Sequence, residues 1–192
     1  MKRRLTGGTE ANSVNKWYGG GFASPTLSFE SIATSNVSTA TPSVTFSSIP
    51  AGFTNLQIRG RWTYTGAGGA ASLYVNFNSD LATNYSWHRL GGLTSAVQSD
   101  GYANEGQIYL AALYKTTNYR SQFILDIPDY LNTSKYKTIR SIHAGNTNAT
   151  GYVGNWGGVW RNTAAITSIT IAANSGNIEA DSQFALYGTK VV

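Results

Sequence analysis

The chain has 192 residues, of which 41% are hydrophobic and 12% aromatic, and its formal net charge is +5. This length and apolar content suffice for one β domain with a full core and exclude a disordered chain. Charged residues make up only 12% of the chain, against about 25% in an average soluble domain. Ser, Thr, Asn, Gln and Gly must therefore supply the polar surface, which favours short strands and tight turns over solvent-exposed helices. The absence of cysteine excludes disulfides and thiolate metal sites.

No segment approaches the roughly 20 apolar residues of a membrane helix. The basic start Lys2-Arg3-Arg4 is followed by polar residues. We therefore expect neither a membrane partner nor a secretory signal. The modest positive charge permits an acidic partner without requiring one.

Residues 1–25 differ in composition from the rest and predict an extended N-terminal arm, followed by a single domain at 26–192. The arm has no periodicity and contains two glycine clusters, Gly7-Gly8 and Gly19-Gly20-Gly21. Its candidate residues for binding another protein or subunit are Lys2, Arg3, Arg4, Lys16, Trp17, Tyr18 and Phe22. Because aromatic rings are uncommon in a free tail, two interpretations stay open. The arm orders on another subunit, or it folds on its own domain or is a cloning remnant.

The clearest element is the segment 55–64, NLQIRGRWTY, which alternates between apolar and polar residues without a break. Its side chains form two sets, one toward a core (Leu56, Ile58, Gly60, Trp62 and Tyr64) and one toward solvent (Gln57, Arg59, Arg61 and Thr63). A shift by one residue would bury two arginines and expose Trp62, so the register is strongly specified. We predict a central strand of an antiparallel sheet.

The remaining segments alternate less regularly. Strands are predicted at 26–34 with a bulge or bend at Ile32, and at 43–47, 73–77, 85–90, 107–113, 119–127, 135–143, 165–172 and 182–190. The last two are predicted to pair through the turn at 174–177. The polar residues 94–104 predict a surface loop, and the Gly/Asn-rich residues 145–158 predict a second loop. Residues 129–132 are compatible with a single helical turn.

About ten short strands with little helical periodicity predict an all-β fold, an antiparallel β-sandwich or jelly roll with an extended N-terminal arm. No repeat of fixed period is present, which argues against propellers and solenoids. The residues predicted to be buried are Trp62, Leu56, Ile58, Val75, Phe77, Leu125, Phe184 and Leu186.

Several segments, in order along residues 40–190, carry a resemblance to a known group of proteins. They are 46–60, 84–90, 129–138, 163–170 and 184–190. In these segments the chain resembles small β-rich virion surface proteins of tailed bacteriophages, of the capsid decoration (cement) or tail appendage type. The resemblance implies a virion surface domain rather than an enzyme, a homo-trimer, and the major capsid protein or another virion protein as partner. It does not extend to the arm.

No arrangement of residues indicates catalysis, a cofactor or a resident metal. Asp126 and Asp129 flank one turn, and Glu179 and Asp181 lie near another, where capping and solvation account for them. His88 is expected to have a structural role. No nucleophile elbow, Walker loop or dinucleotide fingerprint occurs. We therefore expect a protein that is not an enzyme.

The side chains of the domain suggest three binding hypotheses. The first is a weak Ca²⁺ site with ligands drawn from Asp80, Asn76, Asn78 and Asn84. The second is a lectin-like surface whose rings stack on sugars, with Trp87, Tyr102, Tyr152, Trp156 and Trp160 as the candidates. Core and subunit-interface packing is the other role for these rings. The third is a nucleic-acid surface formed by the basic residues Arg59, Arg61, Lys135, Lys137 and Arg140. These residues are interleaved with core positions and not clustered, so no nucleic-acid partner is expected.

Two functions stay open on this sequence. One is a capsid decoration or cement protein, located on the virion, that binds the capsid surface through residues 1–25 and stabilises the shell. The other is a tail-fibre or receptor-binding module that recognises a host surface glycan. A tail fibre usually needs a long shaft, for which this chain has no segment, so the first function is favoured.

Overall fold

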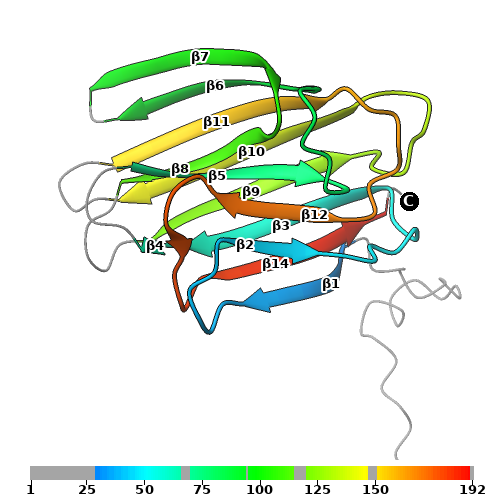
Figure 1. Cartoon of the computed structure of the whole chain (residues 1–192), viewed down its shortest axis with the longest axis horizontal. Helices are drawn as coiled ribbons and strands as arrows, with labels where there is room; N and C mark the ends of the chain where they lie inside the picture. Colours follow the sequence, from blue (N-terminus) through cyan, green and yellow to red (C-terminus); the bar gives the residue numbers. More distant parts are fainter. Residues whose placement is uncertain (1–28, 66–69, 94, 115–119, 147–150, 191–192) are drawn as a thin grey trace, which may run out of the picture.

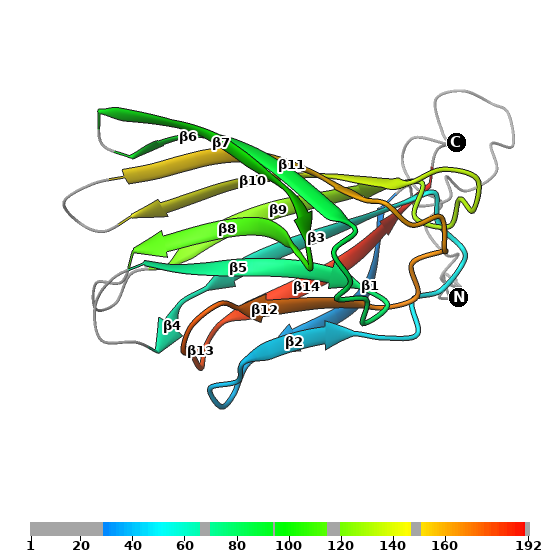
Figure 2. The same cartoon turned by 45° about the horizontal axis from the view of Figure 1, so that its top comes forward.

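The computed structural model describes residues 29–65, 70–93, 95–114, 120–146 and 151–190, and these form strands and turns without any helix. Two antiparallel sheets pack face to face around one hydrophobic core (Figures 1 and 2). The predicted arm at 1–25 lies outside the described residues. The all-β sandwich predicted from the sequence is confirmed.

The large sheet has eight strands, in the spatial order β1 (Phe29–Asn36), β14 (Gln183–Thr189), β3 (Asn55–Trp62), β9 (Ser121–Pro128), β10 (Lys137–Asn146), β11 (Gly151–Trp160), β6 (Tyr85–Leu93) and β7 (Ala96–Glu105). The small sheet has four strands, in the order β2 (Ser43–Phe46), β12 (Ile169–Ala173), β5 (Ala70–Phe77) and β8 (Ile108–Tyr114). A short ladder joins β4 (Tyr64–Thr65) to β13 (Asn177–Ile178). Every strand pair is antiparallel.

The strand order is that of a jelly roll. The part β1-β14-β3-β9 of the large sheet faces β2-β12-β5-β8, and the chain passes between the two sheets as two interlocked Greek keys. Two pairs of strands are inserted into this plan, β6 with β7 and β10 with β11, and both are added to the same side of the large sheet. The large sheet is therefore twice as wide as the small one.

Strand β3 is central, as predicted, and pairs with β14 on one side and β9 on the other. Its alternation is observed in full, with Leu56, Ile58 and Trp62 buried and Arg59 and Arg61 exposed. All the residues predicted to be buried are at most 1% exposed. The predicted irregularity near Ile32 is a register shift between Ser31 and Ala33, where β1 pairs with β14.

Three predictions at the level of elements were wrong. The segment predicted as the loop 94–104 forms most of β7, a polar strand exposed on both faces, which therefore lacks an apolar alternation. Most of the predicted loop 145–158 belongs to β10 and β11. Along β11 the buried positions alternate glycine with large aromatic rings, a period-two pattern that the glycines conceal. The two C-terminal strands do not pair, because β12 and β14 lie in different sheets.

Residues 129–132 form a turn closed by a hydrogen bond from Asn132 N to Asp129 O.

Gly158 sets the distance between the two sheets at the place where β11 packs against β8. It lies on the buried face of β11, and a Cβ atom there would come within 2.6 Å of Ile108 Cγ2 and 2.9 Å of its Cδ1. Ile108 is fully buried on β8 in the opposite sheet. Because packed cores tolerate added volume poorly, only glycine lets β8 approach β11 this closely.

We predict that Gly158→Ala lowers the free energy of unfolding by about 1–3 kcal/mol, the usual cost of overpacking a core. The matched control is Gly157→Ala on the same strand, because Gly157 faces solvent and an added Cβ would have its nearest neighbour 4.0 Å away. Urea unfolding of the two variants and the parent measures the difference. Equal midpoints for both variants would contradict this account of the sheet spacing.

Candidate interaction surfaces

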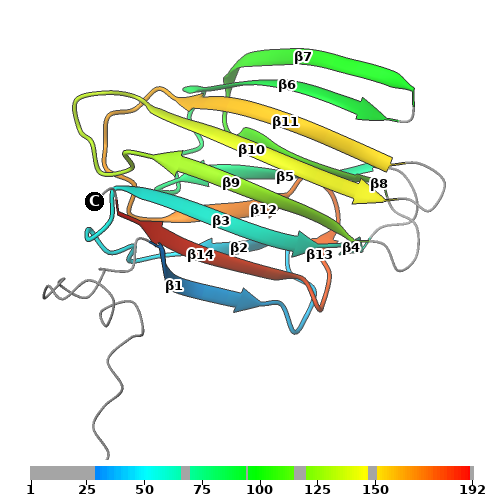
Figure 3. The same ribbon diagram turned by 180° about the vertical axis from the view of Figure 1, so that it is seen from behind.

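The outer face of the large sheet carries five exposed aliphatic side chains. They lie on β9, β10, β11, β6 and β7, and we call them the outer stripe: Ile124 (41% exposed), Ile142 (51%), Val153 (62%), Leu90 (59%) and Val97 (79%). Figure 3 shows the large sheet from this side.

The pairing register places the outer stripe in two adjacent rows across the sheet. One row runs through Ile124, Ile142, Asn155 and Leu90, and the other through Ala144, Val153, Gly92 and Val97. Contiguous apolar side chains of this kind on a monomer mark an interaction surface.

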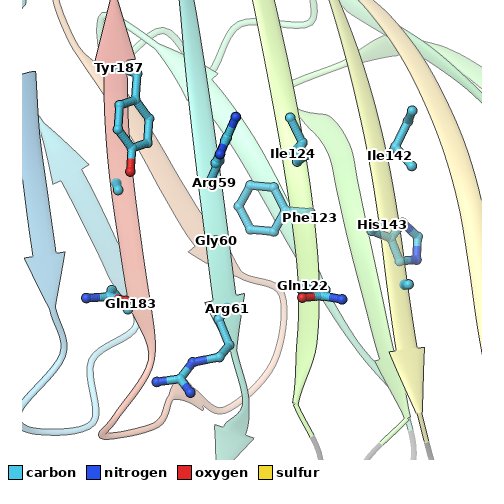
Figure 4. A pocket seen from close by; sticks show the side chains of 12 residues that line it. Arg59, Gly60, Arg61, Gln122, Phe123, Ile124, Ile142, His143, Gln183 and Tyr187 are labelled. Carbon is cyan, nitrogen blue, oxygen red and sulfur yellow. The ribbon is translucent and has the colours of Figure 1, made fainter. Parts of the chain in front are cut away.

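A groove of about 470 Å³ opens at the β9–β10 end of the outer stripe. Figure 4 shows Ile124 and Ile142 on one side of it and Arg59 and Tyr187 on the other. The small side chain of Ala185 on β14 contributes to its lining. The groove is therefore apolar with a basic rim, which suits an apolar side chain flanked by an acidic group.

The Arg59 side chain is held in place at this rim. Its guanidinium carbon lies 5.1 Å from the ring centre of Phe29 and 5.6 Å from that of Tyr187, and the two rings stack 4.7 Å apart. Arg59 Nε also donates to Gln57 Oε1 at 2.8 Å. A guanidinium ordered in this way loses less entropy on binding a partner than a free one.

Polar side chains also connect the free edge of β8 to the large sheet. Ser141 Oγ donates to Leu110 O at 3.0 Å, and the Ser121 hydroxyl shares its single proton between Ala144 O at 3.1 Å and Ala112 O at 3.3 Å. Ala112 N in turn donates to His143 Nε2 at 3.4 Å. The three side chains are buried. Since a buried strand edge without partners is costly, these polar residues complete the backbone hydrogen bonding of β8.

His143 also belongs to a row of rings that runs from the core to the surface. The aromatic row is His143, Trp156, Tyr109, Trp87 and Tyr102, with successive ring centres 3.9, 5.5, 5.1 and 4.9 Å apart. Burial, together with the positive charge of Arg89, lowers the pKa of His143 to about 3. The imidazole is therefore neutral at neutral pH, which leaves its Nε2 free to accept the bond from Ala112 N.

The five rings proposed to stack on sugars differ in their exposure. Tyr152, Trp156, Trp160 and Trp87 are at most 6% exposed and pack in the core, whereas Tyr102 is 54% exposed. Four of the five rings therefore present no open face to a sugar, and Tyr102 at the end of the aromatic row is the one available for stacking. The arm residues predicted to bind a capsid or subunit, Lys2 to Phe22, lie outside the described residues.

Three of the four carboxylates that lie near turns, those of Asp126, Asp129 and Asp181, have structural partners. Asp126 accepts from Gln57 at 2.8 Å and pairs with Arg140 at 2.8 Å, and Asp129 pairs with Lys135 at 2.5 Å. Asp181 pairs with Arg120 at 3.7 Å. These contacts place the carboxylates in turns and on the outer face.

Asp80, the centre of the calcium hypothesis, organises a turn. Its oxygens accept N–H groups from Ala82, Asn84 and Trp160 at 2.8–2.9 Å. These bonds, led by that of Asn84, lower the pKa of Asp80. Asn78 instead binds the segment 165–168. Within the described ranges no group of three or more His, Cys, Asp or Glu side chains could hold a metal.

Among the basic residues interleaved with core positions, Lys137 is only 1% exposed. Its ammonium donates to the backbone oxygens of Asn132, Lys135 and Thr163, and burial lowers its pKa. Lys137 therefore connects two loops.

The described part of the chain contains no helix long and apolar enough to cross a membrane.

Comparison of the chain with models of protein families gives no match, and comparison with curated proteins gives none either.

The outer stripe was not found from the sequence. At Ile124 a signal existed, because Phe123, Ile124 and Leu125 are three successive apolar residues in a one-sided strand, and one of them must face out. At Ile142 the alternation predicts the wrong face, with the isoleucine buried and its polar neighbours exposed. Ser141 and His143 are buried instead, because they bind the backbone at the edge of β8.

We predict that the free energy of unfolding falls as the pH is lowered from about 6.5 to about 4.5, with a slope that approaches 1.4 kcal/mol per pH unit. The reason is that His143 takes up a proton at its ordinary pKa of 6.5 when unfolded, but only near pH 3 in the folded chain. Urea unfolding of the parent and of His143→Phe at a series of pH values measures the slope.

The variant should lose most of this slope. The control is His88→Gln, which changes the other histidine of the chain, an exposed one, and should keep it. A His143→Phe chain with the slope of the parent would show that another group causes the acid sensitivity.

Proposed function

We propose that this chain is a structural protein of a virion surface, a capsid decoration protein that binds the major capsid protein and stabilises the shell. In this proposal the arm, residues 1–25, is the anchor and the jelly-roll domain is the part that covers the capsid. The protein carries out no catalysis and needs no cofactor.

The architecture supports the proposal by analogy. Jelly rolls of two antiparallel sheets are frequent in viral capsid domains, and also in lectins. A fold shared with capsid proteins does not by itself assign a function, because function depends on the residues at the surface.

The observation that carries the proposal is the outer stripe. A sheet face with five exposed aliphatic side chains is unusual for a protein that acts alone. The few charges on that face are largely held by internal contacts, as with Arg140 and Asp126. Little desolvation would therefore oppose burial of this face against a protein shell.

The arm has the charged and aromatic residues that binding to an acidic protein surface requires. Its four basic residues, Lys2, Arg3, Arg4 and Lys16, would be attracted to an acidic capsid surface and speed the encounter. Trp17, Tyr18 and Phe22 are of the residue types that provide most of the binding energy at interfaces. The resemblance to phage surface proteins adds a homo-trimer to the proposal.

A second function, recognition of a host glycan by a tail appendage, is favoured by one observation. The half-exposed ring of Tyr102 lies against Trp87, with 4.9 Å between ring centres, so its position is fixed as a stacking platform requires. A single open ring supports weak binding at most, which ranks this function below the first.

We predict that deletion of residues 1–25 weakens binding to preformed capsids at least ten-fold, because the proposed anchor is removed. The measurement is co-sedimentation of the purified chain with capsids over a concentration series. A matched variant, with Trp17, Tyr18 and Phe22 changed to Ala and the basic residues kept, separates aromatic burial from charge.

Equal binding by the truncated and intact chains would contradict the arm as anchor. Binding of the intact chain to host cell-wall polysaccharide, with loss of that binding in Tyr102→Ala and no binding to capsids, would establish the second function instead.

A further inference from the structure

Strand β7 is the outermost strand of the large sheet and lies beyond the reach of the small sheet (Figures 1 and 3). Among the described residues it pairs with β6 and with no other strand. Seven of its ten residues are exposed and the other three are half-buried. A strand that is exposed over most of both faces and open along one edge is held mainly by its pairing with the neighbouring strand, here β6.

The open edge of β7 differs from the other strand edges of the sandwich. At the opposite end of the large sheet, β1 is interrupted by a register shift and carries the ion pair of Glu30 with Lys190. In the small sheet, β2 has only four residues, and the edge of β8 is completed by side chains of the large sheet. These are the means by which proteins prevent strand edges from associating.

Strand β7 has none of these protections over most of its length. Its sequence, AVQSDGYANE, contains no lysine, arginine or proline. Its register shift against β6 occurs only at the last residues, between Ala103 and Glu105. The charge of Asp100 is neutralised by two hydrogen bonds from Arg89 of the neighbouring strand, at 2.5 and 2.8 Å.

We propose that β7 pairs with β7 of a second copy of this chain, antiparallel and across a two-fold axis perpendicular to the sheet. The contact is independent of the proposed virion function. It is an isologous interface, in which the same strand supplies both sides, and it would extend the large sheet from one copy into the next.

The register of β6 with β7 shows which backbone groups are available. The pair closes at Leu93 and Ala96, separated by two residues, and such a closing pair exchanges hydrogen bonds. By alternation, Gln98, Asp100 and Tyr102 bind β6. The residues between them direct their N–H and C=O groups toward the open edge: Val97, Ser99, Gly101 and Ala103.

Charge decides where the axis lies. An axis at Asp100 would place two aspartates opposite each other, which is unfavourable. An axis at Gly101 places Asp100 opposite Tyr102 of the second copy, and an axis at Ser99 places it opposite Gln98. In both registers the exposed ring of Tyr102 and the exposed Val97 gain cover from the second copy. The strand is therefore complementary to itself.

The test is the change Ser99→Pro in the full chain, because proline removes an N–H that points to the open edge and leaves the β6–β7 hydrogen bonds in place. Ser99→Thr is the matched control that keeps the N–H, and Val97→Pro is a second edge variant. Sedimentation equilibrium over a concentration series gives the mass and the dissociation constant. Hydrogen exchange reports the amides of residues 97, 99, 101 and 103.

We expect the parent and Ser99→Thr to form a dimer, or a hexamer if the proposed trimer also forms, with the amides of Ser99 and Gly101, which pair with the second copy in both registers, protected at high concentration. Ser99→Pro and Val97→Pro should weaken the two-fold association at least ten-fold with an unchanged unfolding midpoint of the dissociated chain. If a variant fails to fold, the concentration dependence of amide protection in the parent decides alone. A parent that is only monomer or trimer, or an even-numbered assembly that persists in both proline variants, overturns the proposal.

Discussion

The structure depends on how a narrow sheet covers a wide one. A four-stranded sheet packs on an eight-stranded sheet, so the free edge of β8 is buried in the middle of the large sheet instead of reaching solvent. Buried backbone groups need partners, and the inward side chains of β9 and β10 supply them. Ser141 and Ser121 donate to the carbonyl groups of β8, and His143 accepts from one of its N–H groups. Polar residues therefore occupy positions that a simple sandwich would fill with aliphatic ones.

The same mismatch explains the aromatic row. Among the described residues, no further strand of the small sheet covers the large sheet beyond β8, so single large rings must fill the space. Tyr109 on β8 contacts both Trp156 and Trp87 edge-on, and Trp87 carries the packing on to Tyr102. Aromatic rings fill this space at a low cost in side-chain entropy, because each ring has few rotatable bonds. The row ends at β7 because the sheet ends there, which leaves Tyr102 with one uncovered side.

The sequence predicted those elements in which one face alone is buried and the other is polar. Strand β3 is the best example, because Leu56, Ile58 and Trp62 alternate with exposed polar side chains. Strand β7 was missed because neither face is buried, so no periodicity exists to be found. Strand β11 was missed because two of its buried positions are Gly154 and Gly158, which leave room for the side chains of Trp156 and Ile108. A segment this rich in glycine has the composition that is typical of a loop. The outer stripe was missed because exposure of Ile142 depends on the edge of β8, a contact between residues far apart in the chain.

The proposed surfaces are compatible in one assembly, and this follows from the symmetry of a sheet. A two-fold axis perpendicular to the large sheet leaves the outer faces of both copies on the same side. The outer stripe ends at Val97 on β7, so pairing at that edge would bring the stripes of two copies together as one continuous apolar surface. Two linked copies that bind a common shell hold each other near it, which raises the apparent affinity without any new contact. An edge that joins copies and a face that binds a shell would therefore reinforce one another, whereas an edge hidden by bulges or lysines would leave each copy to bind alone.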